Sequence, residues 1–252
     1  MTATIDLNAD LGEDESAKGI ARDIAIMDIV SSCNIACGGH AGSSETMRAM
    51  LVTAKTKGVS VGAHPSYPDR ANFGRISIEI NPASLKSSLL EQLATIKAMA
   101  VDIATNIIHL KPHGALYNDA QDNEALADIL VEIARTKNLA LVGMAGSIAN
   151  QKANENGVRF IAEAFIDRRY TKRARLVPRT EEDAVIANDA ERIEQGLALA
   201  QGKSIVTAGN QLLTLKAGTL CLHSDSDGAL ATAKAMRRAL ERENISIMAP
   251  TA

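Results

Sequence analysis

Short apolar runs alternate with longer amphipathic segments along most of the chain. Between the runs, apolar residues recur on one helical face, as Leu85, Leu89 and Leu93 do after Pro82. This alternation predicts parallel strands joined by helical crossovers, because such connections return the chain to the same end of a sheet. Seven runs have the length of buried strands, at residues 3–10, 31–39, 59–65, 107–114, 139–146, 158–165 and 218–225.

Further helices are predicted from their termini and stripes. Ser43 or Ser44 caps a segment that closes at Gly58 and carries the stripe Met47, Met50, Leu51 and Ala54. After the fourth apolar run, a similar stripe is formed by Leu126, Ile129, Leu130 and Ile133. The segment 204–218 is expected to add an extra strand or turn.

Polar, chemically competent residues follow nearly every apolar run at its carboxyl end. In a closed barrel these ends form one rim around one pocket, whereas an open sheet gathers only the groups near its switch point. We therefore predict an α/β fold, a (β/α) barrel variant, in a single domain over residues 1–252. The residues in question are Asp10, Glu13, His40, His64, Lys111, His113, Asp167, Arg168, His223 and Asp225.

Composition narrows the range of partners. Lys plus Arg number 27 against 30 for Asp plus Glu, and the net charge of −3 offers no positive field for nucleic acid or anionic membranes. The chain shows neither a signal peptide nor an apolar run near the ~18 residues of a membrane helix, so we expect a cytoplasmic protein. Cys33, Cys37 and Cys221 are expected to be free, buried thiols, since they are odd in number and lack a CxxC pair.

The first apolar run places Asp6, Asn8 and Asp10 on one face of a strand. Two carboxylates aimed into a barrel require compensation by a cation, a substrate ammonium or a neighbouring lysine. The alternative is a solvated strand end rich in turn-forming residues. An EF-hand is excluded, because Leu11 and Ala17 stand where glycine and glutamate are required.

The fourth run ends in a pair suited to acid–base chemistry. His113 lies two residues from Lys111, and a neighbouring cation favours the neutral imidazole near pH 7. Lys111 is a candidate to stabilise an oxyanion, and a surface lysine beside a turn histidine is the alternative. His223 and Asp225 form a similar pair after the last run. His109 lies inside its apolar run and is expected to be a core histidine whose hydrogen bonds are satisfied.

Two loops and several absent motifs give further information about the candidate site. The loop with His64, Asp69 and Arg70 is too polar for a core and too rigid for a linker, so we interpret it as a pocket wall. The glycines before His40 permit close backbone approach or simply a tight turn. The stretch "GLALAQGKS" fails as a phosphate-binding loop in spacing and context, and neither G-x-S-x-G nor HExxH occurs.

Nine ordered motifs together resemble the lactam-utilisation family, which includes the A subunit of bacterial ATP-dependent 5-oxoprolinase. The resemblance spans about residues 5–227. It implies a barrel that commonly has seven strands and is related to the glycoside hydrolase/deacetylase superfamily. It also implies ATP-dependent opening of 5-oxo-L-proline, a lactam, to L-glutamate together with partner subunits B and C. The motifs are "DLNADLGE", "NIACGGHAG", "GAHPSYPDR", "NFGR", "KPHGALYN", "GMAGS", "EAFIDRRY", "LVPR" and "CLHSD".

Carried over motif by motif, the resemblance implies one candidate site, and a few departures bear on its shape. Gly39, Ser43 and Ser224 stand where the family usually has Phe, Asp and Gly, and the Asp-Gly usual before "LVPR" is missing. These changes concern substrate identity more than reaction class. The implied site comprises Asp6, Asn8, Asp10, Glu13, His40, His64, Lys111, His113, Asp167, Arg168, His223 and Asp225.

Three functional hypotheses follow. In the first, a partner supplies much of the ATP site and this barrel binds the lactam or hydrolyses the activated intermediate, with an Asp or His activating water and Lys111 or Arg168 steadying the oxyanion. In the second, the chain is a stand-alone metal-dependent deacetylase or amidohydrolase that holds a divalent ion on Asp6 or Asp10 with a histidine. In the third, it is a non-catalytic substrate-binding subunit.

Overall fold

The computed structural model describes residues 3–224 and 228–250, and its central feature is a closed ring of seven parallel strands. Neighbouring strands follow chain order, and the pairing of the first with the last closes the ring. This confirms the predicted seven-stranded (β/α) barrel. The strands are β1 (Thr4–Leu11), β2 (Ser32–Ala36), β3 (Ser60–His64), β4 (Ile107–Leu110), β5 (Ala140–Met144), β6 (Phe160–Phe165) and β9 (Thr219–His223).

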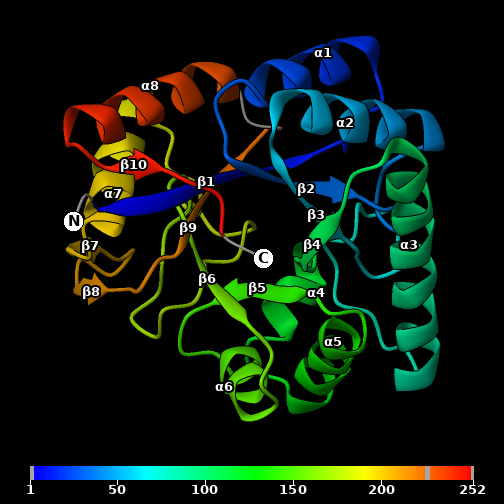
Figure 1. Ribbon diagram of the computed structural model, residues 1–252. Helices are drawn as coiled ribbons and strands as arrows, with labels where there is room; N and C mark the ends of the chain where they lie inside the picture. Colours follow the sequence, from blue (N-terminus) through cyan, green and yellow to red (C-terminus); the bar gives the residue numbers. More distant parts are fainter. Residues whose placement is uncertain (1–2, 225–227, 251–252) are drawn as a thin grey trace.

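Helices surround the ring (Figure 1). They are α1 (Ala17–Ile26), α2 (Ser44–Lys57), α3 (Pro82–Ile103), α4 (Gly114–Asp119), α5 (Glu124–Thr136), α6 (Ile148–Glu155), α7 (Asp189–Ala200) and α8 (Ala229–Arg242). The segment 204–218 forms the predicted extra element, an antiparallel hairpin of β7 (Ser204–Val206) and β8 (Leu212–Thr214). A short strand, β10 (Ser246–Ile247), pairs in parallel with β1 outside the ring. Within the described ranges, every helix is too short or too polar to cross a membrane.

Helix α2 starts and ends, and helix α3 starts, where the sequence predicted. Ser43 caps α2 by accepting a hydrogen bond from the Thr46 amide, and Gly58 ends the helix in the left-handed conformation at φ 70°. Pro82 occupies the first turn of α3, where its missing N–H costs no hydrogen bond. The stripes on α2, α3 and α5 are largely buried, which places most of the apolar core in the layer between helices and ring.

The interior of the ring is polar. Asn8 on β1 donates to Thr219 Oγ1 at 2.7 Å and to Glu163 Oε1 at 3.1 Å, although β9 separates β1 from β6 in the sheet. Such contacts are possible only across the inside of the barrel. Asp6 accepts hydrogen bonds from the hydroxyls of Ser31, Ser32 and Thr219. Asp6 and Asn8 therefore belong to the filled interior and not to the rim.

Strand register sets the level at which the rim begins. Asp10 pairs with Asn34 of β2 and with His223 of β9, and His64 pairs with Ala36 at the end of β2. The side chains that follow these positions therefore emerge at the same end of the ring. That end carries the candidate site.

Candidate active site

A cavity of about 1420 Å³ opens at the carboxyl ends of the strands. Residues far apart in the sequence meet there, as the rim pattern predicted. Predicted residues that line it are Asp10, Glu13, His64, Lys111, His113, Arg168 and His223. His40 and Asp167 are buried directly behind this wall, against Glu13 and His223 respectively. Asp225, the remaining predicted residue of the rim, lies outside the described residues.

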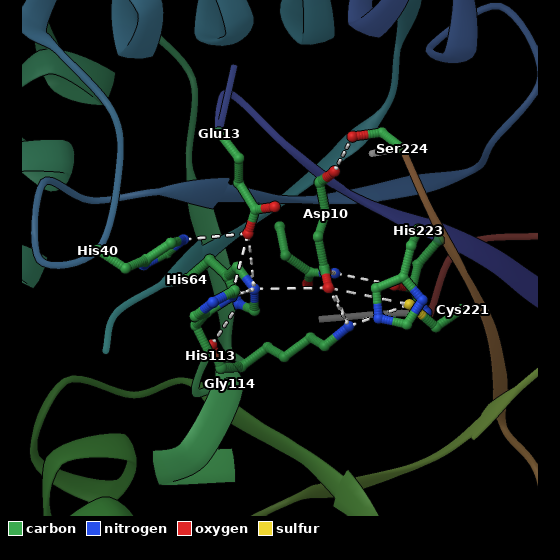
Figure 2. A network of polar contacts seen from close by, with 12 residues as sticks. Asp10, Glu13, His40, His64, His113, Gly114, Cys221, His223 and Ser224 are labelled. Carbon is green, nitrogen blue, oxygen red and sulfur yellow. Dashed lines mark hydrogen bonds and ion pairs between the residues drawn. The ribbon is translucent and has the colours of Figure 1, made fainter. Parts of the chain in front are cut away.

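Glu13 stands at the centre of a cluster of three histidines (Figure 2). Its Oε1 lies 3.0 Å from His40 Nε2, 3.0 Å from His113 Nδ1 and 3.7 Å from His64 Nε2. The His40 and His113 rings stack with their centroids 3.6 Å apart. Four potential ligand atoms, one from each residue, lie within 4.8 Å of one another. We call these four residues the Glu13–histidine cluster.

Backbone carbonyls fix two of the rings in this cluster. His64 Nδ1 lies 2.8 Å from the Lys111 carbonyl, and His113 Nε2 lies 3.0 Å from the Phe73 carbonyl. A carbonyl accepts only, so each of these nitrogens donates an N–H. In neutral rings, His64 Nε2 and His113 Nδ1 then face each other with lone pairs at 3.0 Å. The pair requires a shared proton or another cation between them.

Burial and nearby charges shift the pKa values of the three histidines in different directions. Burial lowers the pKa of His40 to about 3 and also lowers the pKa of His113. Burial also opposes protonation of His64, but the Asp10 carboxylate outweighs it and raises the pKa of that ring. The neutral form of His113 is thus favoured as expected, although burial and His64 are the cause and not Lys111.

Lys111 is enclosed by acceptors. Its Nζ lies 2.8 Å and 3.0 Å from the two oxygens of Asp10, 2.8 Å from Glu163 Oε1 and 3.2 Å from Cys221 Sγ. These contacts occupy all three ammonium donors, and the side chain is 2% exposed. Lys111 supplies the compensating cation that the carboxylates of the barrel required. It is placed as a counter-ion and not as a free oxyanion donor.

Asp10 is ionised by this arrangement. Burial opposes its charge, but His64 and Lys111 outweigh burial and hold the pKa of Asp10 well below its ordinary value. Asn34 donates a further hydrogen bond to Asp10 Oδ1 at 2.8 Å. The result is a fixed negative charge beside the Glu13–histidine cluster.

Asp167 and His223 form a second acid–base pair on the opposite side of the rim. His223 Nδ1 lies 2.8 Å from Asp167 Oδ2, so the carboxylate orients the ring and fixes Nδ1 as the protonated nitrogen. Burial opposes the charge of Asp167, but His223 and Arg179 outweigh it and lower the pKa of the carboxyl. Ser224 secures the strand end by donating to the Asp10 carbonyl at 2.8 Å.

The LamB/YcsF family matches residues 5–252 of the chain. The chain belongs to this family. It is 39% identical to the A subunit of 5-oxoprolinase from Histophilus somni over 245 residues, which are 96% of this chain and 97% of that protein. Identity to the corresponding A subunit from Bordetella pertussis is also 39%, over 99% of this chain and 100% of that protein. The family resemblance drawn from the sequence motifs is confirmed.

Solved structures place this LamB/YcsF barrel among known folds. A lactam utilization protein from Thermus thermophilus superposes with a TM-score of 0.90 at 32% identity, covering 98% of this chain and all of that one. A family 4 carbohydrate esterase from Streptomyces lividans reaches 0.50 at 11% identity, covering 97% of this chain and 91% of that one, which shows likeness of fold alone. The expected relation to deacetylase-like barrels is confirmed at the level of the fold.

Sequence reasoning missed two members of the site in this LamB/YcsF protein. Glu163 is buried between Lys111 and Asn8, and Asn34 links Asn8 and Asp10. Both lie inside apolar runs, where a charged or amide residue on the inward face of a strand was the available signal. His109 is only partly satisfied: its Nε2 lies 2.7 Å from Asn34 Oδ1, while Nδ1 has no partner within the described part of the chain.

Proposed function

We propose that this chain is the A subunit of an ATP-dependent 5-oxoprolinase, which opens 5-oxo-L-proline to L-glutamate together with partner subunits B and C. Family membership and the names of relatives matched over nearly their full length support the assignment. The observation that carries it is the convergence in one cavity of the Glu13–histidine cluster, the Asp10–Lys111 pair and the Asp167–His223 pair. Three free, buried cysteines fit a cytoplasmic enzyme.

The chemistry of the substrate explains the need for ATP. A five-membered lactam is an unstrained, resonance-stabilised amide, and phosphorylation of its oxygen makes the ring carbon a better electrophile. The chain contains no recognisable nucleotide-binding loop. We therefore assign the ATP site to the partner subunits and hydrolysis of the activated lactam to this barrel.

The bonds change in two steps. Water adds to the ring carbon, the ring C–N bond breaks, and the ring nitrogen takes up a proton and leaves as the amine. The acyl phosphate that results is hydrolysed by a second water to the carboxylate and inorganic phosphate. His223, oriented by Asp167, is placed to accept the proton of the water and to pass it to the ring nitrogen.

Fixed charges complete this scheme. Asp10 and Lys111 hold each other ionised and set the electrostatic field of the cavity. Arg168, and not the fully engaged Lys111, is the cation of the cavity wall placed to bind the negatively charged oxygens of the activated lactam. Lys111 acts in this scheme as a positioning residue.

One observation favours a second function, that of a metal-dependent amidohydrolase. Four of the six separations within the Glu13–histidine cluster are 3.0 to 3.7 Å, close to the roughly 3.4 Å between ligand atoms of a tetrahedral ion, and all six are within 4.8 Å. Backbone carbonyls orient two of the three rings, as is usual for ligating histidines. A divalent ion held by three of these four groups would keep one position open for a water, act as a Lewis acid and lower the pKa of that water.

The ligand set differs from the expected one. Asp6 is engaged by the hydroxyls of Ser31, Ser32 and Thr219 inside the ring, and Asp10 is engaged by Lys111. Glu13, which is joined to three histidines, takes the place of these aspartates. The residues therefore fit a metal, and its ligands would come from Glu13, His40, His64 and His113.

A reconstituted assay decides between these functions. The purified chain is incubated with 5-oxo-L-proline alone, with ATP, and with ATP plus the partner subunits, and glutamate is measured. We expect turnover only in the complete mixture. Full turnover by the chain without ATP refutes the proposed division of labour and favours the amidohydrolase, whose signature is about one bound metal per chain, lost in His40→Ala. A mere binding subunit is indicated if His223→Gln retains full kcat at saturating substrate.

A further inference from the structure

Two arginines of the cavity wall have no carboxylate partner within the described ranges. Arg168 is 4% exposed, and its hydrogen bonds go to carbonyls: Nε donates to Ala184 at 3.3 Å and Nη2 to Val177 at 2.6 Å. Arg179 is exposed on the loop after β6 and lines the same cavity. No ion pair within 4.0 Å joins either to an acidic residue in the part of the chain that is described.

Two neighbouring cations of the cavity wall are paired with carboxylates, unlike Arg168 and Arg179. Lys111 is paired with Asp10 and Glu163, and Arg175 is paired with Asp122 at 2.7 Å. Asp167, the acidic residue nearest in sequence, is hydrogen-bonded to His223 and attracts Arg168 and Arg179 only at longer range. Among the described residues, this side of the cavity thus carries more positive charge than its close carboxylate contacts neutralise.

A buried guanidinium without a counter-ion is costly, and its geometry indicates what would compensate it. Arg168 uses two of its five N–H donors on carbonyls, and the planar group can offer others to an oxyanion in the cavity. Burial, and then the charge of Arg179, lower the pKa of Arg168 to about 10, so it remains cationic at neutral pH. The mutual repulsion of the two side chains is relieved by an anion placed between them.

We propose that Arg168 and Arg179 form the subsite for an oxyanion substituent of the lactam, and that this subsite selects acid-bearing lactams over neutral ones. The inference rests on the proposed function and names the residues that determine its substrate class. The oxyanion is the carboxylate of 5-oxo-L-proline or the phosphoryl group of its activated form. Both offer oxygens to a guanidinium fork in the same way.

The alternative role for Arg168 is structural, since its two carbonyl contacts tie the loop of residues 167–188 to the barrel. Arg179 is exposed and makes no such contact with the described residues, so its replacement tests the subsite without loosening the loop. Arg173 is exposed on the same loop but does not line the cavity, and it provides a matched control for the loss of one positive charge.

Calorimetric titration of the full chain tests the proposal without requiring turnover. The probes are 5-oxo-L-proline, the neutral lactam 2-pyrrolidinone and inorganic phosphate, each titrated into the parent chain, Arg168→Gln, Arg179→Gln and Arg173→Gln. We expect Arg168→Gln to weaken an oxyanion ligand by about 10- to 100-fold, as for hydrogen bonds to a charged group, and Arg179→Gln by a smaller factor. Binding of 2-pyrrolidinone, and every value for Arg173→Gln, should stay unchanged.

Loss of 5-oxo-L-proline affinity identifies the carboxylate as the bound group, and loss of phosphate affinity alone identifies the phosphoryl group. Either supports the subsite. The subsite is refuted if the substitutions weaken the binding of acidic and neutral lactams equally. It is also refuted if Arg179→Gln and a folded Arg168→Gln both bind every probe with unchanged affinity. If melting shows that Arg168→Gln does not fold, Arg179→Gln decides. The two hypotheses can fail separately. If the chain binds oxyanions through this subsite but never supports glutamate formation with its partners, the proposed function is wrong and the subsite stands.

Discussion

Replacing Lys111 by methionine separates its role as a counter-ion from that of an oxyanion donor. The substitution keeps the length of the side chain and removes the ammonium that lies 2.8 Å from both Asp10 and Glu163. Each contact corresponds to about 6 kcal/mol of attraction at an effective dielectric constant of about 20. The cost of burying three charges offsets much of this attraction. Breaking a buried pair typically costs about 3–5 kcal/mol.

We therefore expect Lys111→Met to lower the melting temperature by roughly 6–20 °C, since about 1 kcal/mol corresponds to 2–4 °C in a chain of this size. The double variant Lys111→Met with Glu163→Gln should recover part of this loss, because one of the two stranded carboxylates is then neutral. Thermal unfolding measures both effects and needs no partner subunit. A double variant that is less stable than the sum of the single changes would contradict the counter-ion role.

The pH dependence of stability and of kcat/KM tests the counter-ion role of Lys111 independently. Lys111 helps to hold the pKa of Asp10 below 3.8, so ionised Asp10 stabilises the parent protein above that pH and the contribution is lost as the pH falls through the folded pKa. Without Lys111 the pKa of Asp10 rises, and the acid limbs of stability and of kcat/KM both move to higher pH. If kcat falls while the melting temperature and both acid limbs stay in place, Lys111 is an oxyanion donor and the counter-ion assignment is wrong.

Three further predictions test other parts of the site. Asp167→Asn, which leaves His223 unoriented, should lower kcat by at least about 100-fold with little change in melting temperature, and full activity would exclude the pair from proton transfer. Burial raises the pKa of Asp23 to about 6, so the parent protein should lose up to about 3 kcal/mol of stability as the pH rises from 4 to 7; urea unfolding of Asp23→Asn should lack this slope. Gly114→Ala places a Cβ 2.4 Å from the Gly74 carbonyl and should cost more than Gly146→Ala, which has a similar φ and open space; equal melting temperatures would contradict this.

The fold was largely predictable because its signals are local. The spacing of apolar runs, the caps of α2 and α3 and the polar residues after each strand all follow from the chain itself. The register that brings Asp10 beside His223 does not, because it depends on closure of the whole ring. The extent of a single domain over residues 1–252 stays a prediction.

The pairings within the site were less predictable than its location. Lys111 stands at the end of β4 and was expected to face a substrate, but its Nζ turns inward to Glu163 on β6, with β5 between the two strands. Glu13 was one acidic residue among several, and its role became visible only when three histidines from separate segments converged on it. Sequence spacing shows which side chains reach the rim, and tertiary packing decides which of them neutralise each other.

The carboxylates of the barrel are compensated in three different ways, and this difference determines which of them are held ionised. Burial raises the pKa of Asp6, which is surrounded by hydroxyls, whereas Asp10 is held ionised by His64 and Lys111. Burial opposes the charge of Glu13, but contacts with His113 and His40 outweigh it and hold the pKa of Glu13 well below its ordinary value. Burial in turn lowers the pKa of His40 and His113 and favours their neutral forms, whereas Asp10 and Lys111 are both held ionised and supply a constant field to the site.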